Sequence, residues 1–235
     1  MNGVRHVGIV GVSAEGAALC YRTICVESAA LLGAHNHPQI TTHTFPLAAY
    51  IRAIEANRWR AVGRLLLGSA NILVRAGAEI LVCPDNTVHQ AFDRVRDRVP
   101  ARWLHIAVEV TAVAAERGFR RVGILGTRSL MEGTLYPVHL GARNIAYEVP
   151  DVHDREQINA IIFDELCYGR VEPRSKEYVF RVMETLREQG CDGVVLGCTE
   201  IPLLISEAES PLPAIDSTRT LARAALRAAT ESVRR

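Results

Sequence analysis

Long hydrophobic runs and an excess of one charge are both missing from this sequence of 235 residues. Lysine and arginine together number 27, aspartate and glutamate number 26, and the two signs stay balanced along the chain. We therefore expect no basic stripe that could follow the phosphates of a nucleic acid or an anionic lipid surface. The apolar stretch near the N-terminus, "HVGIVGV", is too short for a signal peptide or a membrane span. These absences predict a cytoplasmic protein with neither nucleic acid nor membrane as a partner.

Paired cysteine motifs are also missing, although the chain has six cysteines. None of them forms a CxxC pair, and most stand in apolar segments, where a reduced thiol packs as a small hydrophobic group. A disulfide framework is not expected in the cytoplasm. His35 and His37 are close in sequence, but no cysteine or carboxylate stands near them at the spacing of metal ligands. We predict no metal site.

What the sequence does contain is a regular alternation of two patterns. Nearly half of its residues are hydrophobic, which is enough for a substantial core. Short apolar runs alternate with amphipathic stretches such as residues 60–75 and 176–189, as is typical of βαβ units with a mainly parallel sheet. The predicted fold class is therefore α/β. The apolar runs are "VGIVGV", "QITTHTF", "EILVC", "VGILGT" and "GVVLGC".

Two pairs of segments look like copies of each other. "RHVGIVGVSAEG" at 5–16 resembles "RRVGILGTRSLMEG" at 120–133, with an offset of 115 residues. "AGAEILVCPDNT" at 76–87 resembles "QGCDGVVLGCTE" at 189–200, with an offset of 113 residues. Two nearly equal offsets indicate an internal repeat, and a repeat determines the architecture of the chain.

The repeat predicts two pseudo-symmetric α/β domains with mainly parallel sheets. We place the first domain at residues 1–97 plus 211–235 and the second at residues 98–210. The stretch after Pro213 is expected to form a closing helix that packs back on the first domain. Open α/β sheets bind ligands beyond the carboxyl ends of their strands, so the predicted active site lies in the cleft between the two domains.

The same repeat singles out two residues as structural counterparts. Asp85 lies eight residues after Gly77, and Cys198 lies eight residues after Gly190. Both therefore stand at the carboxyl end of corresponding strands. Asp85 and Cys198 are the predicted catalytic residues.

Two neighbours of Asp85 receive structural interpretations instead. Cys83 corresponds to Leu196, which stands inside a strand, so we expect Cys83 to be a buried core thiol. His89 falls on the following helix, and we expect it to have a structural role at the surface.

Each catalytic candidate leads from a strand into a helix N-terminus, where unpaired N–H groups and the helix dipole favour an anion. Such a terminus also lowers the pKa of a thiol, so we expect Cys198 to form a thiolate near neutral pH. Hydroxyl and amide groups at the same turns could bind a substrate carboxylate, although each alone is typical of a helix cap. An acid and a base on opposite faces of one carbon would invert its configuration by proton transfer. The predicted substrate-binding residues at the turns are Ser13, Asn86, Thr87, Thr127, Ser129 and Thr199.

At these residues the sequence resembles the aspartate/glutamate racemase superfamily. "GCTEIPLLI" at 197–205 is similar to the second catalytic motif of that family. Glu200, after Cys-Thr, looks like the aspartate racemase branch, and we add it to the predicted substrate-binding residues. "DNTVH" at 85–89 stands in the place of the first motif, normally Cys-Asn-Thr, and "INAIIFDELCYG" at 158–169 is similar to segments of broad-specificity amino-acid racemases. The resemblance covers nearly the whole chain.

The resemblance implies an enzyme that needs no cofactor and uses two opposed acid/base residues, usually both cysteines. Cys198 would be one of them, and Asp85 replaces the other. An ordinary aspartate has a pKa of about 3.9 against about 8.5 for cysteine, so a carboxylate is the weaker base unless burial strengthens it. Three roles stay open for Asp85: a desolvated base, a group that only positions substrate, or a change that abolished turnover. Dimers are common in the family, which makes a homodimer possible.

A second departure from the family pattern concerns the segment near which the substrate side chain would bind. In "HTFPLAAY" at 43–50, near which aspartate racemases usually place a polar or charged group, this chain has apolar residues. An apolar substrate side chain is therefore possible. Three residues offer a charge in place of the missing group, and each of them also fits an ordinary solvated role: Arg170, Arg174 and Lys176.

The leading hypothesis is a cofactor-independent amino-acid racemase or epimerase, an isomerase that works without pyridoxal phosphate. The first alternative is a decarboxylase or cis-trans isomerase of the same superfamily that needs only Cys198. The second alternative is a non-catalytic binder of small carboxylates. A dinucleotide-binding domain fits poorly, because the early glycines do not match GxGxxG. Those glycines are Gly8, Gly11 and Gly16.

Overall fold

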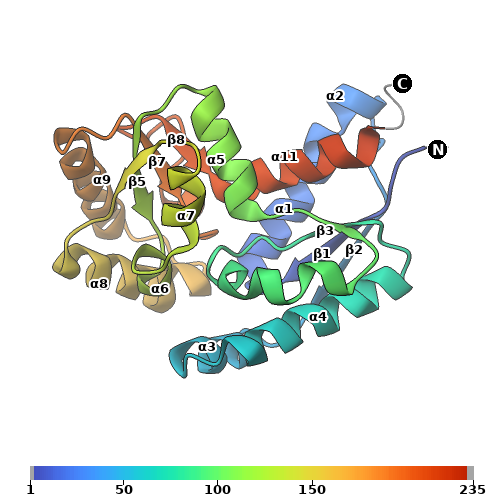
Figure 1. Cartoon of the computed structure of the whole chain (residues 1–235). Helices are drawn as coiled ribbons and strands as arrows, with labels where there is room; N and C mark the ends of the chain where they lie inside the picture. The colour runs from blue at the N-terminus through green and yellow to red at the C-terminus, as the bar shows by residue number, and fades with distance from the viewer. Residues whose placement is uncertain (1–2, 232–235) are drawn as a thin grey trace. The chain divides into compact units, whose positions relative to one another are not determined.

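The computed structural model describes residues 3–231 and divides the chain into two compact units (Figure 1). The first unit contains the residues up to Ile106 and those from Thr218 on, and the second contains Ala107–Ser217. The sequence analysis places these boundaries after residues 97 and 210. They lie later in the chain because strand β4 (Arg102–Trp103) pairs with the first sheet and strand β8 (Ala214–Asp216) pairs with the second.

The first unit is built on a four-stranded sheet in the order β2-β1-β3-β4, and all of its strand pairs are parallel. Strands β1 (Val7–Gly11) and β3 (Ile80–Val82) are buried along their whole length, whereas β2 (Ile40–Thr44) is partly exposed. The helices of this unit are α1 (Ala14–Glu27), α2 (Ala29–Leu32), α3 (Leu47–Glu55), α4 (Trp59–Arg75), the 3-10 helices η1 (Thr87–Arg94) and η2 (Arg96–Arg98), and α11 (Ser217–Thr230) from its second residue on.

Helices α1 and α4 cover opposite faces of the first sheet (Figure 1). Gly8 and Gly11 are three residues apart on β1, so they face opposite sides of the sheet. A Cβ atom at Gly8 would lie 3.1 Å from Leu73 on α4, and one at Gly11 would lie 3.3 Å from Ala17 on α1. The two glycines therefore allow both helices to pack closely against β1.

The closing helix α11 packs back on the first unit, as the sequence predicts. The amide of Arg5 donates a hydrogen bond of 3.0 Å to the carbonyl of Ala229. The guanidinium of Arg223 forms an ion pair of 2.9 Å with Glu27 on α1.

The second unit repeats this arrangement with a four-stranded parallel sheet in the order β6-β5-β7-β8. Its other strands are β5 (Arg121–Leu125), β6 (Ala146–Glu148) and β7 (Gly193–Leu196). Its helices are α5 (Ile106–Glu116) from the second residue on, α6 (Arg128–Met131), α7 (Leu135–Gly141), α8 (Val152–Ala160), the π-helix η3 (Ile161–Glu165), the 3-10 helix η4 (Leu166–Tyr168), α9 (Pro173–Glu188) and α10 (Ile201–Leu204). The α/β fold with two pseudo-symmetric units is thus confirmed. Among residues 3–231, none of the helices combines the length and apolar character that crossing a bilayer requires.

The strand register agrees with the structural equivalence of Asp85 and Cys198 that the repeat predicts. Val7 on β1 pairs with Ile80 on β3, and Val122 on β5 pairs with Gly193 on β7. These pairs are related by the same offsets of 115 and 113 residues that the sequence shows. Because Asp85 and Cys198 each lie five residues after the β3 or β7 partner, they occupy equivalent positions in the two units.

Helices α4 and α9 are each followed by a glycine of the repeated segments. Gly77 has φ +96° and Gly190 has φ +89°, a region that side chains disfavour. The next amide after each glycine bonds back to the helix: Ala78 donates to Leu73 at 3.0 Å and Cys191 donates to Leu186 at 3.1 Å. This is the Schellman type of helix end, which turns the chain toward the following strand.

We expect Gly190→Ala to lower the free energy of unfolding by about 1–2 kcal/mol, because an alanine is strained at positive φ. Nothing lies within 4 Å of a Cβ atom at Gly190, so the effect would come from the backbone alone. Urea denaturation measures the change. Gly141→Ala is the control, since Gly141 is the last residue of α7, has no positive φ and also has nothing within 4 Å of a Cβ atom. Equal stabilities of the two variants would contradict the expectation.

Candidate functional site

Ser13 and Asp85 follow the two central strands of the first sheet. The hydroxyl of Ser13 caps α1 by accepting a hydrogen bond of 3.2 Å from the amide of Gly16. Asp85 follows β3 and is partly exposed. Its Oδ1 accepts a hydrogen bond of 3.1 Å from the amide of Val88 in η1. The Asp85 carboxylate thus caps a helix while one side of the residue stays open to solvent.

His89 is buried, so the expectation of a surface position is wrong. Its side chain is 3% exposed and stacks on Phe92 with a centroid distance of 5.2 Å. Nδ1 lies 2.7 Å from the carbonyl oxygen of Asp85, and Nε2 lies 3.3 Å from the amide nitrogen of Ile106. Since Nε2 accepts from that amide, Nδ1 carries the proton and donates to Asp85. The segment forms a 3-10 helix that packs into the unit, and His89 holds the backbone of Asp85 in place.

Cys83 is buried in the core of the first unit, as predicted, with 1% of its surface exposed. Burial raises the pKa of its thiol well above the usual value, and the negative charge of Asp85 raises it further. Burial also raises the pKa of the Tyr50 phenol, and the charge of Asp85 adds to that rise. Asp85 therefore lies near a thiol and a phenol that both stay protonated, and Cys83 is not poised to be a nucleophile.

Backbone contacts fix the approach to Cys198 in the second unit. The amide of Gly197 donates a hydrogen bond of 2.7 Å to the carbonyl of Leu125, at the end of β5. A Cβ atom at Gly126 would lie 3.3 Å from the carbonyl carbon of Gly197, and one at Gly197 would lie 3.0 Å from the Leu125 oxygen. The two strand ends therefore approach closely where Cys198 begins its turn.

Cys198, Thr199 and Glu200 form one buried hydrogen-bonded group. The thiol of Cys198 donates to Oε2 of Glu200 at 3.0 Å, and the hydroxyl of Thr199 donates to the same oxygen at 2.7 Å. Their exposed fractions are 6% for Cys198, 4% for Thr199 and 3% for Glu200. Glu200 thus accepts a hydrogen bond from the thiol of the same protein. The sequence predicts it instead as a substrate-binding residue.

The pKa of Cys198 is raised well above its usual value, so the expectation of a thiolate near neutral pH is wrong. Burial is the largest cause, followed by the charge of Glu200 and its hydrogen bond to the thiol. The helix dipole does not offset these effects, because α10 has four residues and begins only at Ile201. In this environment the Cys198 thiol keeps its proton and donates it in a hydrogen bond to Glu200.

The remaining predicted substrate-binding residues fall into two groups. Asn86 and Thr87 are buried next to Asp85. Thr127 is half-buried and caps α6 by accepting a hydrogen bond of 3.3 Å from Leu130, while Ser129 is exposed on α6. Thr127 therefore has the capping role in the second unit that Ser13 has in the first.

One buried carboxylate is not among the site residues predicted from the sequence. Asp216 ends β8, pairs in register with Leu196 and is 1% exposed. Its charge adds to the burial that raises the pKa of Tyr136. The next residue, Ser217, donates a hydrogen bond of 2.8 Å to the carbonyl of Leu196. The signal in the sequence is an aspartate that directly follows a short apolar run, "AID".

Two of the three candidate charges for a substrate side chain are engaged elsewhere. Lys176 forms an ion pair of 2.6 Å with Glu209 and contributes to lowering the pKa of that carboxyl to about 2. The guanidinium of Arg170 donates to the carbonyl oxygen of Asp164. Arg174 is exposed. As for metals, no group of three or more potential ligands is found among residues 3–231.

Comparison with known proteins agrees with the resemblance read from the sequence. A family model described as Asp/Glu/Hydantoin racemase matches residues 9–225. Among curated proteins, the broad-specificity amino-acid racemase RacX of Bacillus subtilis is 23% identical over 200 residues, which cover 82% of this chain and 84% of that protein.

Solved structures agree as well. A Yersinia pestis protein assigned to the Asp/Glu racemases matches with a TM-score of 0.86 and 32% identity, over 96% of this chain and 99% of that one. An aspartate racemase homologue from Pyrococcus horikoshii matches with a TM-score of 0.82 and 28% identity, again over 96% and 99%.

Replacing Glu200 with glutamine is expected to make the Cys198 thiol ionise at lower pH. Glutamine has nearly the same size but no negative charge, and that charge contributes to the raised pKa of Cys198. The measurement is the rate at which iodoacetamide alkylates each cysteine over a series of alkaline pH values, read by mass spectrometry. The midpoint for Cys198 should fall.

Cys191 supplies the internal control for this experiment. It is also buried, and its pKa is raised to about 11 by burial and by the charge of Glu148. Its alkylation profile should not respond to Glu200→Gln. If neither cysteine responds, the Glu200 charge does not act on the Cys198 thiol.

Proposed function

Because the chain belongs to the Asp/Glu/hydantoin racemase family, we propose that it is a cofactor-independent amino-acid racemase or epimerase. In this proposal Asp85 and Cys198 exchange protons with the α-carbon of an amino acid. The observation that carries it is the equivalence of these two residues at the ends of β3 and β7. Inversion requires one proton-transfer group on each face of the carbon, and a duplicated strand end supplies two such groups.

The proton balance of the reaction follows from the two side chains. In one direction the Asp85 carboxylate removes the α-proton, and the Cys198 thiol gives its own proton to the other face. Asp85 is then protonated and Cys198 is a thiolate. In the reverse direction the thiolate removes the α-proton and the carboxylic acid returns one. Proton exchange with solvent restores the starting state between turnovers.

Glu200 has a positioning role in this scheme. It orients the thiol through the 3.0 Å hydrogen bond and keeps the proton on Cys198 until the substrate carbanion needs it. It can also receive that proton when Cys198 must act as the base. Thr199 holds the receiving oxygen at 2.7 Å, so the carboxylate stays in one orientation.

A substrate without a second charge is favoured by the segment at residues 43–50, near which aspartate racemases usually place a polar or charged group. Phe45 and Leu47 are apolar and partly buried, and Phe45 contacts the ring of His43 at a centroid distance of 4.9 Å. Lys176 is already paired with Glu209. We therefore propose a neutral or apolar amino acid rather than a dicarboxylic one.

A second candidate function is a decarboxylase or isomerase that uses only Cys198. It is favoured by the hydrogen bond from Val88 to the Asp85 carboxylate, which gives Asp85 a structural role that needs no proton transfer. A protonated, buried thiol also suits the delivery of a single proton to an enediolate. In this case the Asp85 side chain would matter for folding more than for turnover.

Deuterium exchange separates the two candidates. We expect the protein to incorporate solvent deuterium at the α-carbon of one or more neutral amino acids in D₂O. Cys198→Ser and Asp85→Asn should each lower this exchange at least tenfold. The side-chain amide introduced by Asp85→Asn can still accept the hydrogen bond from Val88 but cannot remove a proton, so a loss there would not come from a lost cap. NMR of the α-proton measures the rate from each enantiomer.

Cys25→Ala is the matched control, because Cys25 lies on α1, is half-buried and has no proposed role. Its exchange rate should equal that of the unchanged protein. Full exchange in Asp85→Asn would exclude the two-residue mechanism. Release of CO₂ from substituted malonates without any α-exchange would instead establish single-cysteine chemistry.

Asp85→Cys is expected to raise the racemase rate several-fold, because a thiolate is a stronger base than a carboxylate. The rate is measured by chiral chromatography for each amino acid that shows exchange. Thermal unfolding serves as the control for the lost cap, since a thiol accepts the hydrogen bond from Val88 poorly. A stable Asp85→Cys protein with no gain on any amino acid would argue against Asp85 as the second base.

A further inference from the structure

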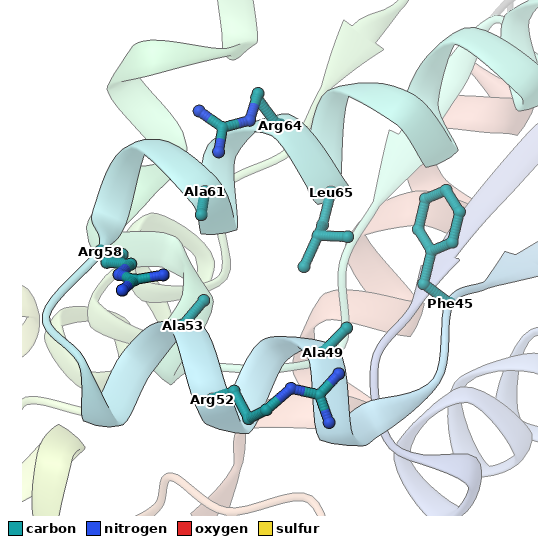
Figure 2. A pocket seen from close by; sticks show the side chains of 8 residues that line it. All are labelled: Phe45, Ala49, Arg52, Ala53, Arg58, Ala61, Arg64 and Leu65. Carbon is teal, nitrogen blue, oxygen red and sulfur yellow. The ribbon is translucent and has the colours of Figure 1, made fainter.

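A cavity of about 390 Å³ lies between helices α3 and α4 of the first unit. Figure 2 shows Ala49 and Ala53 of α3 facing Ala61 and Leu65 of α4 across it, with Phe45 at one end. The facing side chains are small and apolar, so the two helices leave an apolar floor between them. Arg52, Arg58 and Arg64 also line this cavity.

A second cavity of about 440 Å³ adjoins the first and shares Arg58, Ala61 and Arg64 with it. It adds Trp59 and two more positive charges to the surface. The five arginines of the two cavities are Arg52, Arg58, Arg60, Arg64 and Arg94. We call this pair of cavities the α3–α4 arginine site.

All five arginines are exposed. Within residues 3–231, none of them forms an ion pair shorter than 4.0 Å. Arginines close by behave differently, since Arg96 pairs with both Asp93 and Asp97. Glu55 is the single acidic residue between residues 45 and 75. The expectation of evenly mixed charge is therefore wrong at this surface.

This combination of groups suits an anion with several charges and an apolar part. A guanidinium binds phosphate oxygens through two parallel hydrogen bonds, and a phosphate group carries nearly two charges and three acceptor oxygens at neutral pH. Two adjoining cavities with shared arginines suit phosphate groups in a row. The apolar floor and the Trp59 ring offer contact to an organic ring. Each volume is within the usual range for sites that bind small molecules.

We propose that the α3–α4 arginine site binds a small organic phosphate with at least two phosphate groups and an apolar or aromatic body, about the size of a nucleotide. The proposal concerns the first unit alone and does not depend on the proposed racemase reaction. Because the site is exposed, its affinity falls as ionic strength rises.

Trp59 provides a direct readout of binding. The chain has two tryptophans, so Trp103→Phe leaves Trp59 as the only indole fluorophore. Titration with ATP and with inorganic triphosphate, without magnesium and at fixed ionic strength, should give saturable changes in emission. ATP is expected to bind several-fold more tightly than triphosphate, because the triphosphate has no group to occupy the apolar floor.

A charge-matched pair of variants tests the arginines. In the Trp103→Phe background, Arg58→Gln with Arg64→Gln should weaken ATP binding at least tenfold. Arg22→Gln with Arg75→Gln removes the same charge from exposed arginines of the same unit that do not line either cavity. This control should change the affinity less than twofold. Should the first double variant fail to fold, Arg64→Lys keeps the charge but loses the two-pronged hydrogen bonding, and should weaken binding several-fold.

Three results would overturn the proposal. The first is the absence of a saturable response to both phosphates, and the second is an equal loss of affinity in both double variants. The third is tighter binding of single-stranded DNA or of polyglutamate than of ATP at the same ionic strength. That third result would mean that the arginines bind an extended polyanion and not a small phosphate.

Discussion

The parallel register of the two central strand pairs is the constraint on which the candidate site depends. Val7 opposite Ile80 and Val122 opposite Gly193 fix where each strand ends and therefore where Asp85 and Cys198 begin their turns. A shift of one residue in a strand moves every side chain to the other face of the sheet. Helices α4 and α9 are followed by glycines that turn the chain into β3 and β7. The positions of the two acid/base candidates therefore follow from backbone geometry alone.

In the second unit, the Glu200 carboxylate contacts both the Cys198 thiol and the Thr199 hydroxyl. A buried carboxylate without hydrogen bonds is strongly destabilising, and here two donors from the adjacent residues satisfy one of its oxygens. The same arrangement that stabilises Glu200 keeps the Cys198 thiol protonated. Burial is the largest cause of the raised thiol pKa, and the contact with Glu200 that stabilises the turn adds to it.

Much of the fold could be predicted from the sequence, because local sequence patterns indicate most of its strands and helices. The buried apolar strands, the amphipathic helices and the repeated glycines each carry their own signal, and the count from glycine to Asp85 and Cys198 agrees with the strand register. Strands β4 and β6 have two and three residues and no apolar run that marks them in the sequence. They form because a neighbouring strand edge is available, which is a property of the folded sheet.

The site is harder to predict, since its properties depend on burial. His89 follows Asp85 by four residues, and nothing local shows that its ring bonds to Ile106 and lies beneath the surface. The raised pKa of Cys198 depends likewise on its burial and on the position of the Glu200 carboxylate, which the sequence "GCTE" does not reveal. The arginine cluster is hidden for a related reason: an average over the chain gives balanced charge, whereas folding α3 against α4 gathers residues of one sign.

Differences between the two units carry more functional information than their similarity. Equivalent turns hold a partly exposed carboxylate in one unit and a buried thiol in the other, and the carboxylate is accompanied by His89 whereas the thiol is accompanied by Glu200. In the proposed mechanism this difference leaves the resting proton on the sulfur of Cys198, where burial and the Glu200 carboxylate hold it. The replacement of one cysteine by Asp85 is in this sense compatible with catalysis, because the duplicated scaffold keeps both positions while allowing each side chain its own surroundings.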